Sequence, residues 1–128
     1  MKKVGKITTE LGAEPTDNDL RCALFLIKRG FDVKFLRANR QSGILTPDME
    51  INGKTYEVKT PSKSKANTLD HAMKKGLKQA KNLIFDLRKL HSTGAKASRK
   101  LQREFQITHE WRELWIITVD KGLLTFKK

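Results

Sequence analysis

The chain has 128 residues, 38% of them hydrophobic, and its 27 Lys and Arg against 14 Asp and Glu give a formal net charge of +13. This length predicts one domain with a single hydrophobic core, and the composition excludes an acidic disordered segment. No apolar run reaches the ~18 residues of a membrane-spanning helix, and residues 1–10 lack the apolar stretch of a secretory signal, so we expect any export signal to lie outside this chain.

The positive charge indicates a polyanionic partner, most commonly nucleic acid, because lysine and arginine release the counterions condensed on phosphates. An acidic protein or an anionic membrane would also match this charge. Cys22 is the only cysteine, which excludes an internal disulfide and a multi-cysteine zinc site. Because it lies in an apolar stretch, we interpret it as a small buried hydrophobic residue.

The first third of the chain predicts an arm, a helix and a strand. Residues 1–15 are expected to form a loosely held arm or a short first element. Thr16 is predicted to cap a helix that ends at Gly30, with acidic residues in its first turn. The apolar positions of this helix predict that it is largely buried; they are Leu20, Ala23, Leu24 and Ile27, widened by Cys22, Phe25 and Leu26. A strand over 31–36 and a polar loop over 37–43 follow.

Residues 46–59 predict a β-hairpin. Asn52-Gly53 separates two alternating segments, and a type I′ turn needs positive φ at both central residues. Counting outward from a two-residue loop fixes the register. The expected pairs are Ile51 with Lys54, Glu50 with Thr55, Met49 with Tyr56 and Asp48 with Glu57.

The second half of the chain predicts alternating helices and strands. Asn67 or Thr68 is expected to cap a helix that reaches Lys81, followed by a buried strand over 82–87 and a basic helix from 95 to about 105. A buried strand over 114–119 and a short strand over 123–126 close the chain. The fold class is therefore α/β or α+β, a single mixed sheet flanked by helices, with an arm at 1–15, a core at 17–87 and a C-terminal helix and hairpin at 95–127.

Alternation along the hairpin places a polar set of residues on one face, namely Asp48, Glu50, Thr55, Glu57 and Lys59. Directly opposed carboxylates repel each other. A divalent cation between Asp48 and Glu57 would offset this repulsion; Mg²⁺ is the expected ion, with Mn²⁺ or Zn²⁺ as alternatives. Lys59 could then orient an attacking water or the phosphate. The alternative is a solvated polar face whose acids are partly neutralised by Lys54 and Lys59.

Pro47-Asp48, followed after eight residues by Glu57-Val58-Lys59, resembles the motif of the PD-(D/E)xK nuclease superfamily. The similarity covers residues 17–87 and implies that superfamily's αβββαβ core. It also implies that Asp48 and Glu57 bind metal and that Lys59 assists attack on a phosphodiester. Asp19 resembles the acidic residue that many members carry in the first helix, usually Glu, and by this resemblance is a further metal ligand.

A closer resemblance is carried by Thr46-Pro47-Asp48, Glu57–Ser62, Lys78-Gln79-Ala80 and Asn82–Arg88. This run is similar to the C-terminal tRNase toxin domains of contact-dependent growth inhibition (CdiA) proteins and to related toxin domains of prophage and mobile-element proteins. The resemblance implies a ribonuclease acting on tRNA, delivered as the C-terminal part of a larger protein into the cytoplasm of a target cell. It also implies a cognate immunity protein, which we expect to be acidic, and a position for Gln79 near the active site.

Basic residues dominate the segment from Lys63 to Arg103, which has 12 Lys and Arg against only Asp70 and Asp86. Such an excess favours phosphate binding over a salt-bridged surface. A solvated helix face is the alternative. The predicted nucleic-acid contacts are Lys63, Lys65, Lys74, Lys75, Lys78, Lys81 and Arg88.

Three other functions remain open. A metal-independent RNase of the barnase, EndoU, colicin or RelE type would use a histidine, but the spacing of His71, His91 and His109 nominates none of them. A DNase of the same superfamily and a non-catalytic nucleic-acid-binding module are also consistent with the residues. Trp111 or Trp115 could stack on a base, although the alternation around Trp115 favours a core position.

Overall fold

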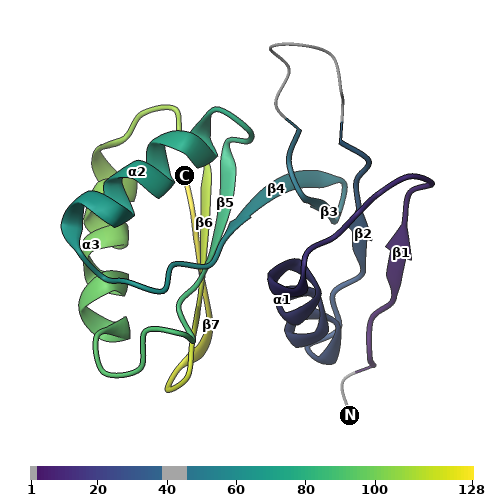
Figure 1. The fold of residues 1–128 in the computed structure, drawn as a ribbon, viewed down its shortest axis with the longest axis horizontal. Coiled ribbons are helices and arrows are strands. Elements are labelled where there is room, and N and C mark those ends of the chain that lie inside the picture. The colour runs from purple at the N-terminus through teal and green to yellow at the C-terminus, as the bar shows by residue number, and fades with distance from the viewer. Residues whose placement is uncertain (1–2, 39–45) are drawn as a thin grey trace.

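The computed structural model describes residues 3–38 and 46–128 and contains, within them, one mixed sheet flanked by helices (Figure 1). The predicted fold class is confirmed. The elements are β1 (Ile7–Thr9), α1 (Asp17–Lys28), β2 (Val33–Phe35), β3 (Met49–Ile51), β4 (Lys54–Lys59), α2 (Ala66–Leu77), β5 (Asn82–Asp86), α3 (Gly94–Ile107), β6 (Glu113–Thr118) and β7 (Gly122–Lys127).

The strands lie in the sheet in their order along the chain, from β1 to β7. The three parallel pairs, β1 with β2, β4 with β5 and β5 with β6, are each connected through a helix. The other pairs are antiparallel. This division follows from geometry, because a parallel pair needs a long crossover while an antiparallel pair can be joined by a tight turn.

The helices cover opposite faces of the sheet. One core forms between α1 and β2, β3 and β4, and the other between α2, α3 and the C-terminal strands. Because side chains alternate along β5, the strand contributes to both cores: Ile84 belongs to the first, and Leu83 and Phe85 belong to the second. Strand β5 is thus buried on both faces, as its continuous apolar sequence predicts. Within the described residues, no helix is both long and apolar enough to cross a membrane.

The N-terminal cap of α1 is confirmed. The Asp19 N–H donates to Thr16 Oγ1 (3.1 Å), and the Thr16 N–H donates to Asp19 Oδ2 (3.0 Å). This reciprocal capping box satisfies two backbone donors that the first turn would otherwise leave unpaired. The arm before it contains the short strand β1, so the second of the two expectations for residues 1–15 is the correct one.

The predicted burial of α1 is wrong for two of its leucines. Leu20 is 38% exposed and Leu24 is 48% exposed. The physical reason is that only one face of α1 contacts the sheet, and a single contact face accommodates a stripe at i, i+3, i+4 and i+7. The residues of that stripe are Asp19, Cys22, Ala23 and Leu26.

The hairpin register is confirmed from the turn outward. Met49 pairs with Tyr56, and Ile51 pairs with Lys54. Asn52 has φ 54° and Gly53 has φ 79°, the positive values that the two-residue turn requires. The Asp48 N–H donates to the Tyr56 carbonyl (3.1 Å), which extends the pairing to the residue just before β3.

Two other predictions need correction or fall outside the structure. Helix α2 begins at Ala66 after Lys65, with no side-chain capping bond, so Asn67 and Thr68 are not its caps. Of the predicted polar loop over 37–43, residues 39–43 lie outside the described residues.

A buried carboxylate that the sequence did not reveal joins β4 to β6 across β5. Glu113 is 4% exposed. It accepts hydrogen bonds from Lys54 Nζ (2.6 Å), Tyr56 Oη (2.9 Å) and Trp115 Nε1 (3.2 Å). Burial by itself would raise the pKa of Glu113, but these donors outweigh it and the pKa is lowered. Lys54 therefore neutralises Glu113 and not the acids of the hairpin.

We predict that Glu113→Gln lowers the free energy of unfolding at pH 7 by about 1–3 kcal/mol, because hydrogen bonds to a charged group are lost. A lowered pKa stabilises the fold above the unfolded-state value, and that stabilisation is lost as the pH falls through the folded-state value. The difference between the wild type and the variant should therefore shrink as the pH drops below about 4. Urea unfolding at several pH values measures this. Glu110→Gln, at an exposed position, is the control; equal stability of the wild type and Glu113→Gln at pH 7 would contradict the prediction.

Candidate active site

The hairpin and the end of α2 bring the predicted catalytic residues together. Asp48 directly precedes β3, Glu57 and Lys59 belong to β4, and Gln79 follows α2. The carboxyl groups of Asp48 and Glu57 each affect the pKa of the other, so the two groups lie near each other. The hairpin register, continued by one pair beyond Met49 and Tyr56, sets the two residues opposite each other as predicted.

Glu57 is buried on the strand that α2 covers, and this overturns the interpretation of a solvated face at that residue. The Glu57 side chain lies in β4, against which α2 packs, and the residue is 4% exposed. A Cβ at Gly76 of α2 would lie 3.0 Å from Leu83 Cδ2 and 3.4 Å from Lys59 Cε. The missing side chain at Gly76 therefore gives the Lys59 stem room to lie beneath the helix.

Lys59 is held between two partners. Its Nζ donates to Glu57 Oε2 (3.0 Å) and to Gln79 Oε1 (3.2 Å). Gln79 in turn donates from Nε2 to the Thr46 carbonyl (3.3 Å). The structure thus places Gln79 beside the lysine and the hairpin, as the family resemblance implied, and gives it the means to orient the ammonium group.

The electrostatics of the carboxyl pair are unfavourable. Burial, followed by the nearby charge of Asp48, raises the pKa of Glu57 to about 8 despite Lys59. Burial also raises the pKa of Asp48, and the charge of Asp19 adds to this, while the Val58 N–H that donates to Asp48 Oδ2 (2.9 Å) opposes it. Glu57 Oε1 is buried without a hydrogen-bond partner. This oxygen therefore lacks a cation or a hydrogen-bond donor beside it.

A hard divalent cation fits this donor set. Mg²⁺ in proteins binds one or two carboxylates and keeps several waters or phosphate oxygens, which matches Asp48 and Glu57 with their unpartnered oxygen. Zn²⁺ usually has three or four protein ligands. Among the described residues, no group of three or more His, Cys, Asp and Glu side chains is arranged to hold a metal. The described side chains therefore do not form a zinc site with three protein ligands.

Asp19 lies near this pair, but its carboxylate takes part in the capping box of α1. It lines a cavity of about 220 Å³ together with Thr46, Pro47 and Asp48. Its Oδ2 accepts from Thr16 in the capping box. Within the described part of the chain, Asp19 does not complete a three-member cluster with Asp48 and Glu57. Its role as a metal ligand stays a prediction.

The predicted nucleic-acid residues fall into two groups. Arg88 is paired with Asp86, which is 3% exposed, through Nε to Oδ1 (2.9 Å) and Nη2 to Oδ2 (2.7 Å). This pair was not predicted from the sequence. The other residues are exposed, and those of α2 lie opposite its buried side; they are Lys63, Lys65, Lys74, Lys75, Lys78 and Lys81.

The aromatic and histidine predictions can also be judged. Trp111 is fully buried and Trp115 is 4% exposed, so the core position predicted for Trp115 is confirmed and neither ring is available for stacking on a base. His71, His91 and His109 are all exposed, as expected for surface residues. Cys22 is fully buried, and burial raises the pKa of its thiol.

We predict that metal-free protein loses stability as the pH rises from about 5 to about 8. The pKa of Glu57 is about 8 in the folded state, above the ~4.3 of an unfolded chain, so folding requires a proton in this window. Glu57→Gln should flatten this slope and be more stable at about pH 8 by on the order of 2 kcal/mol. Urea unfolding in the presence of a chelator tests this, with Glu50→Gln in the same hairpin as the control; parallel curves for wild type and Glu57→Gln would contradict it.

Comparisons with known proteins place this chain in a family. Residues 45–123 match the family described as the contact-dependent growth inhibition CdiA C-terminal domain. Among solved structures, the fold is similar to a chain of the "CdiA-CT/CdiI toxin and immunity complex from Burkholderia pseudomallei", with a TM-score of 0.70, 15% identity, and coverage of 97% of this chain and 100% of the other. No curated protein matches.

The family match spans more than half of the chain and includes both strands of the hairpin and all of α2. It therefore covers Asp48, Glu57, Lys59 and Gln79, whereas Asp19 lies outside it. The structural similarity agrees with it at the level of the fold. The chain belongs to the family of contact-dependent growth inhibition CdiA C-terminal domains.

Proposed function

We propose that this chain is a metal-dependent ribonuclease toxin domain that cleaves tRNA, with the PD-(D/E)xK arrangement of catalytic residues. The observation that carries the proposal is the carboxyl pair of half-buried Asp48 and buried Glu57, with an unpartnered oxygen of Glu57 on one side and Lys59 on the other. A strongly basic chain that sets two acids opposite each other, one of them buried, has a specific need for them, since they destabilise the fold by themselves.

The residues divide the work as follows. Asp48 and Glu57 hold the cation, which when bound supplies positive charge against the charge that develops on the phosphate. Lys59 donates a hydrogen bond to a phosphoryl oxygen or orients the attacking water. Gln79 keeps the Lys59 ammonium group in place through its 3.2 Å contact. The exposed lysines of α2 bind the phosphate backbone without reading sequence.

Delivery and inhibition follow from the family. A C-terminal domain is part of a longer protein, and we propose that it acts in the cytoplasm of the target cell. The similar Burkholderia chain is described in a complex of toxin and immunity protein. A cognate immunity protein with an acidic surface would match the +13 net charge and associate quickly with this chain.

A metal-independent ribonuclease is the second candidate, and one observation favours it. With a pKa of about 8, Glu57 retains its proton at neutral pH in the absence of a cation. A protonated carboxyl group beside a lysine is a suitable general acid. The response of cleavage to a chelator separates the two candidates.

We predict that the purified chain cleaves tRNA with Mg²⁺ or Mn²⁺, and that EDTA abolishes the cleavage. Asp48→Asn and Glu57→Gln should lower the rate by at least about 100-fold while remaining folded, with Glu50→Gln as the matched control. In wild type only, saturating Mn²⁺ should also raise the melting temperature, because the ion binds the folded state.

Each contrary result points to a specific alternative. Full activity in EDTA would favour the metal-independent ribonuclease. Fragmented chromosomal DNA with intact RNA after expression in bacteria would identify a DNase. Bound but intact RNA and DNA, and no toxicity, would leave a nucleic-acid-binding module.

We predict opposite kinetic effects for Lys59 and Lys78. Lys59→Gln should reduce kcat by about 100-fold or more with little change in KM, because its charge acts mainly on the transition state. Lys78→Gln should instead raise KM and lower the salt dependence of RNA binding by nearly one unit of slope. Steady-state kinetics and binding at several salt concentrations measure both, and equal kinetic effects would contradict the assigned roles.

A further inference from the structure

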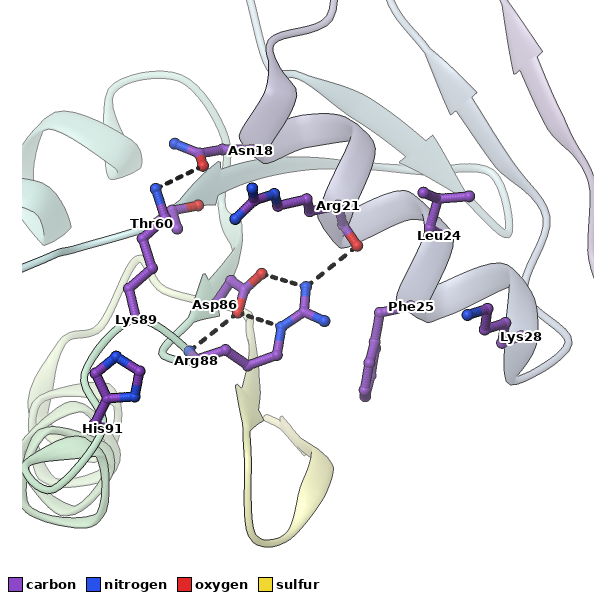
Figure 2. Close-up of a pocket in the computed structure, with 10 residues that line it drawn as sticks. All are labelled: Asn18, Arg21, Leu24, Phe25, Lys28, Thr60, Asp86, Arg88, Lys89 and His91. Atoms are coloured by element: carbon purple, nitrogen blue, oxygen red, sulfur yellow. Dashed lines mark hydrogen bonds and ion pairs between the residues drawn. The ribbon is translucent and has the colours of Figure 1, made fainter.

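A basic cavity of about 570 Å³ lies between α1 and the segment that follows β5 (Figure 2). Arg21, Phe25 and Lys28 line it from α1, and Arg88 and Lys89 line it from the opposite side. It belongs to neither the carboxyl pair nor the lysines of α2. Its volume is in the range of small-molecule binding sites.

The cavity has an excess of positive charge. Asp86 is the only acidic residue in its lining, and Arg88 neutralises it through the paired contacts described above. Arg21, Lys28 and Lys89 remain, and they leave three uncompensated positive charges. No described acidic side chain forms an ion pair with Arg21 or Lys28, and both residues are exposed.

The two walls of the cavity are fixed to each other. Arg88 Nη2 donates to the Arg21 carbonyl (3.2 Å), and its guanidinium group lies 5.1 Å from the centre of the Phe25 ring. Lys89 Nζ donates to Asn18 Oδ1 (3.0 Å). These contacts connect α1 to the segment after β5. Figure 2 draws the hydrogen bonds among them as dashed lines. The cavity is therefore a built feature and not a chance gap between surface side chains.

Two residues in the lining of the cavity are neighbours, along the chain, of candidate site residues. Thr60, which lines it, follows Lys59 directly. Asn18, also in its lining, precedes Asp19, which shares the neighbouring cavity with Asp48. The lining of the cavity is thus one residue along the chain from Lys59 and from Asp19.

We infer that this cavity is a subsite for a phosphate-bearing nucleotide of single-stranded nucleic acid, next to the position where the strand is cleaved. Arg21, Lys28 and Lys89 would contact the phosphates, and Arg88, held by Asp86, would support the wall. The inference rests on the proposed function for its choice of nucleic acid. A concave site beside the reacting groups suits a strand better than the surface of an acidic protein, which needs a broad contact area.

The experiment compares two triple variants with the same loss of charge. One carries Arg21→Gln, Lys28→Gln and Lys89→Gln in the cavity, and the other carries Lys96→Gln, Lys121→Gln and Lys127→Gln at exposed positions elsewhere. Both are made in the Glu57→Gln background, so that the RNA stays intact. The probe is a fluorescein-labelled single-stranded RNA of about a dozen nucleotides, followed by fluorescence anisotropy at several salt concentrations.

The cavity variant should bind the RNA at least about 10-fold more weakly near 0.1 M salt and lose about two units of salt slope, since each lost contact to a single strand removes about 0.7. The control variant should lose much less of both. Photocrosslinking of a 4-thiouridine-containing RNA should also label peptides from residues 17–28 or 86–91. Equal losses in the two variants, or no labelling of these peptides, would overturn the inference.

Failure of the subsite and failure of the proposed catalysis give different results. Weaker binding by the cavity variant supports the subsite even if wild type cleaves no RNA, because binding is measured without cleavage. If wild type cleaves tRNA but the cavity variant binds RNA like the control, the subsite is wrong and the proposed function stands. Loss of immunity-protein binding alone in the cavity variant would overturn the subsite in favour of a protein interface.

Discussion

The opposition of Asp48 and Glu57 in the hairpin is the constraint on which the site depends. The two carboxyl groups repel each other, and burial raises the pKa of both. The fold tolerates them because Val58 donates to Asp48 and Lys59 donates to Glu57. These bonds compensate the pair only in part, since one oxygen of Glu57 remains unpartnered.

Strand β4 explains how a polar site can form inside such a small domain. Its alternation directs Tyr56 and Val58 into the core under α1, and Glu57 and Lys59 toward the face that α2 covers. One strand thereby anchors the hairpin in a hydrophobic core and presents reactive groups on its other side. A site built on a strand held in this way is more rigid than a site built on a loop.

The chain buries much of its negative charge and exposes its positive charge. The buried acidic residues are Asp19, Glu57, Asp86 and Glu113. Asp19 caps a helix, Asp86 holds Arg88, Glu113 joins two strands, and Glu57 belongs to the carboxyl pair. Three of them form ion pairs with Lys59, Arg88 or Lys54, so the net charge of +13 is carried by other basic residues. This suits a protein that must attract a polyanion and be captured quickly by an acidic partner.

The amino-acid sequence by itself determined the features that depend on neighbouring residues. Asn52-Gly53 set the hairpin register and with it the opposition of Asp48 and Glu57, while Thr16 and Asp19 set the start of α1. The position of Gln79 near the site was predicted only from the family resemblance, because no local pattern connects Gln79 with Lys59. The apolar periodicity of α1 did not determine which of its faces packs on the sheet, so Leu24 was wrongly assigned to the core.

Only the tertiary structure decided the contacts between residues distant in the chain. Glu113 meets Tyr56 across 57 positions, and Arg88 meets the Arg21 carbonyl across 67. That second contact joins the two walls of the basic cavity, α1 and the segment after β5. Local patterns record the conformation of a segment and its polar or apolar face, whereas the partner of a buried charge depends on which segments the folded sheet places side by side.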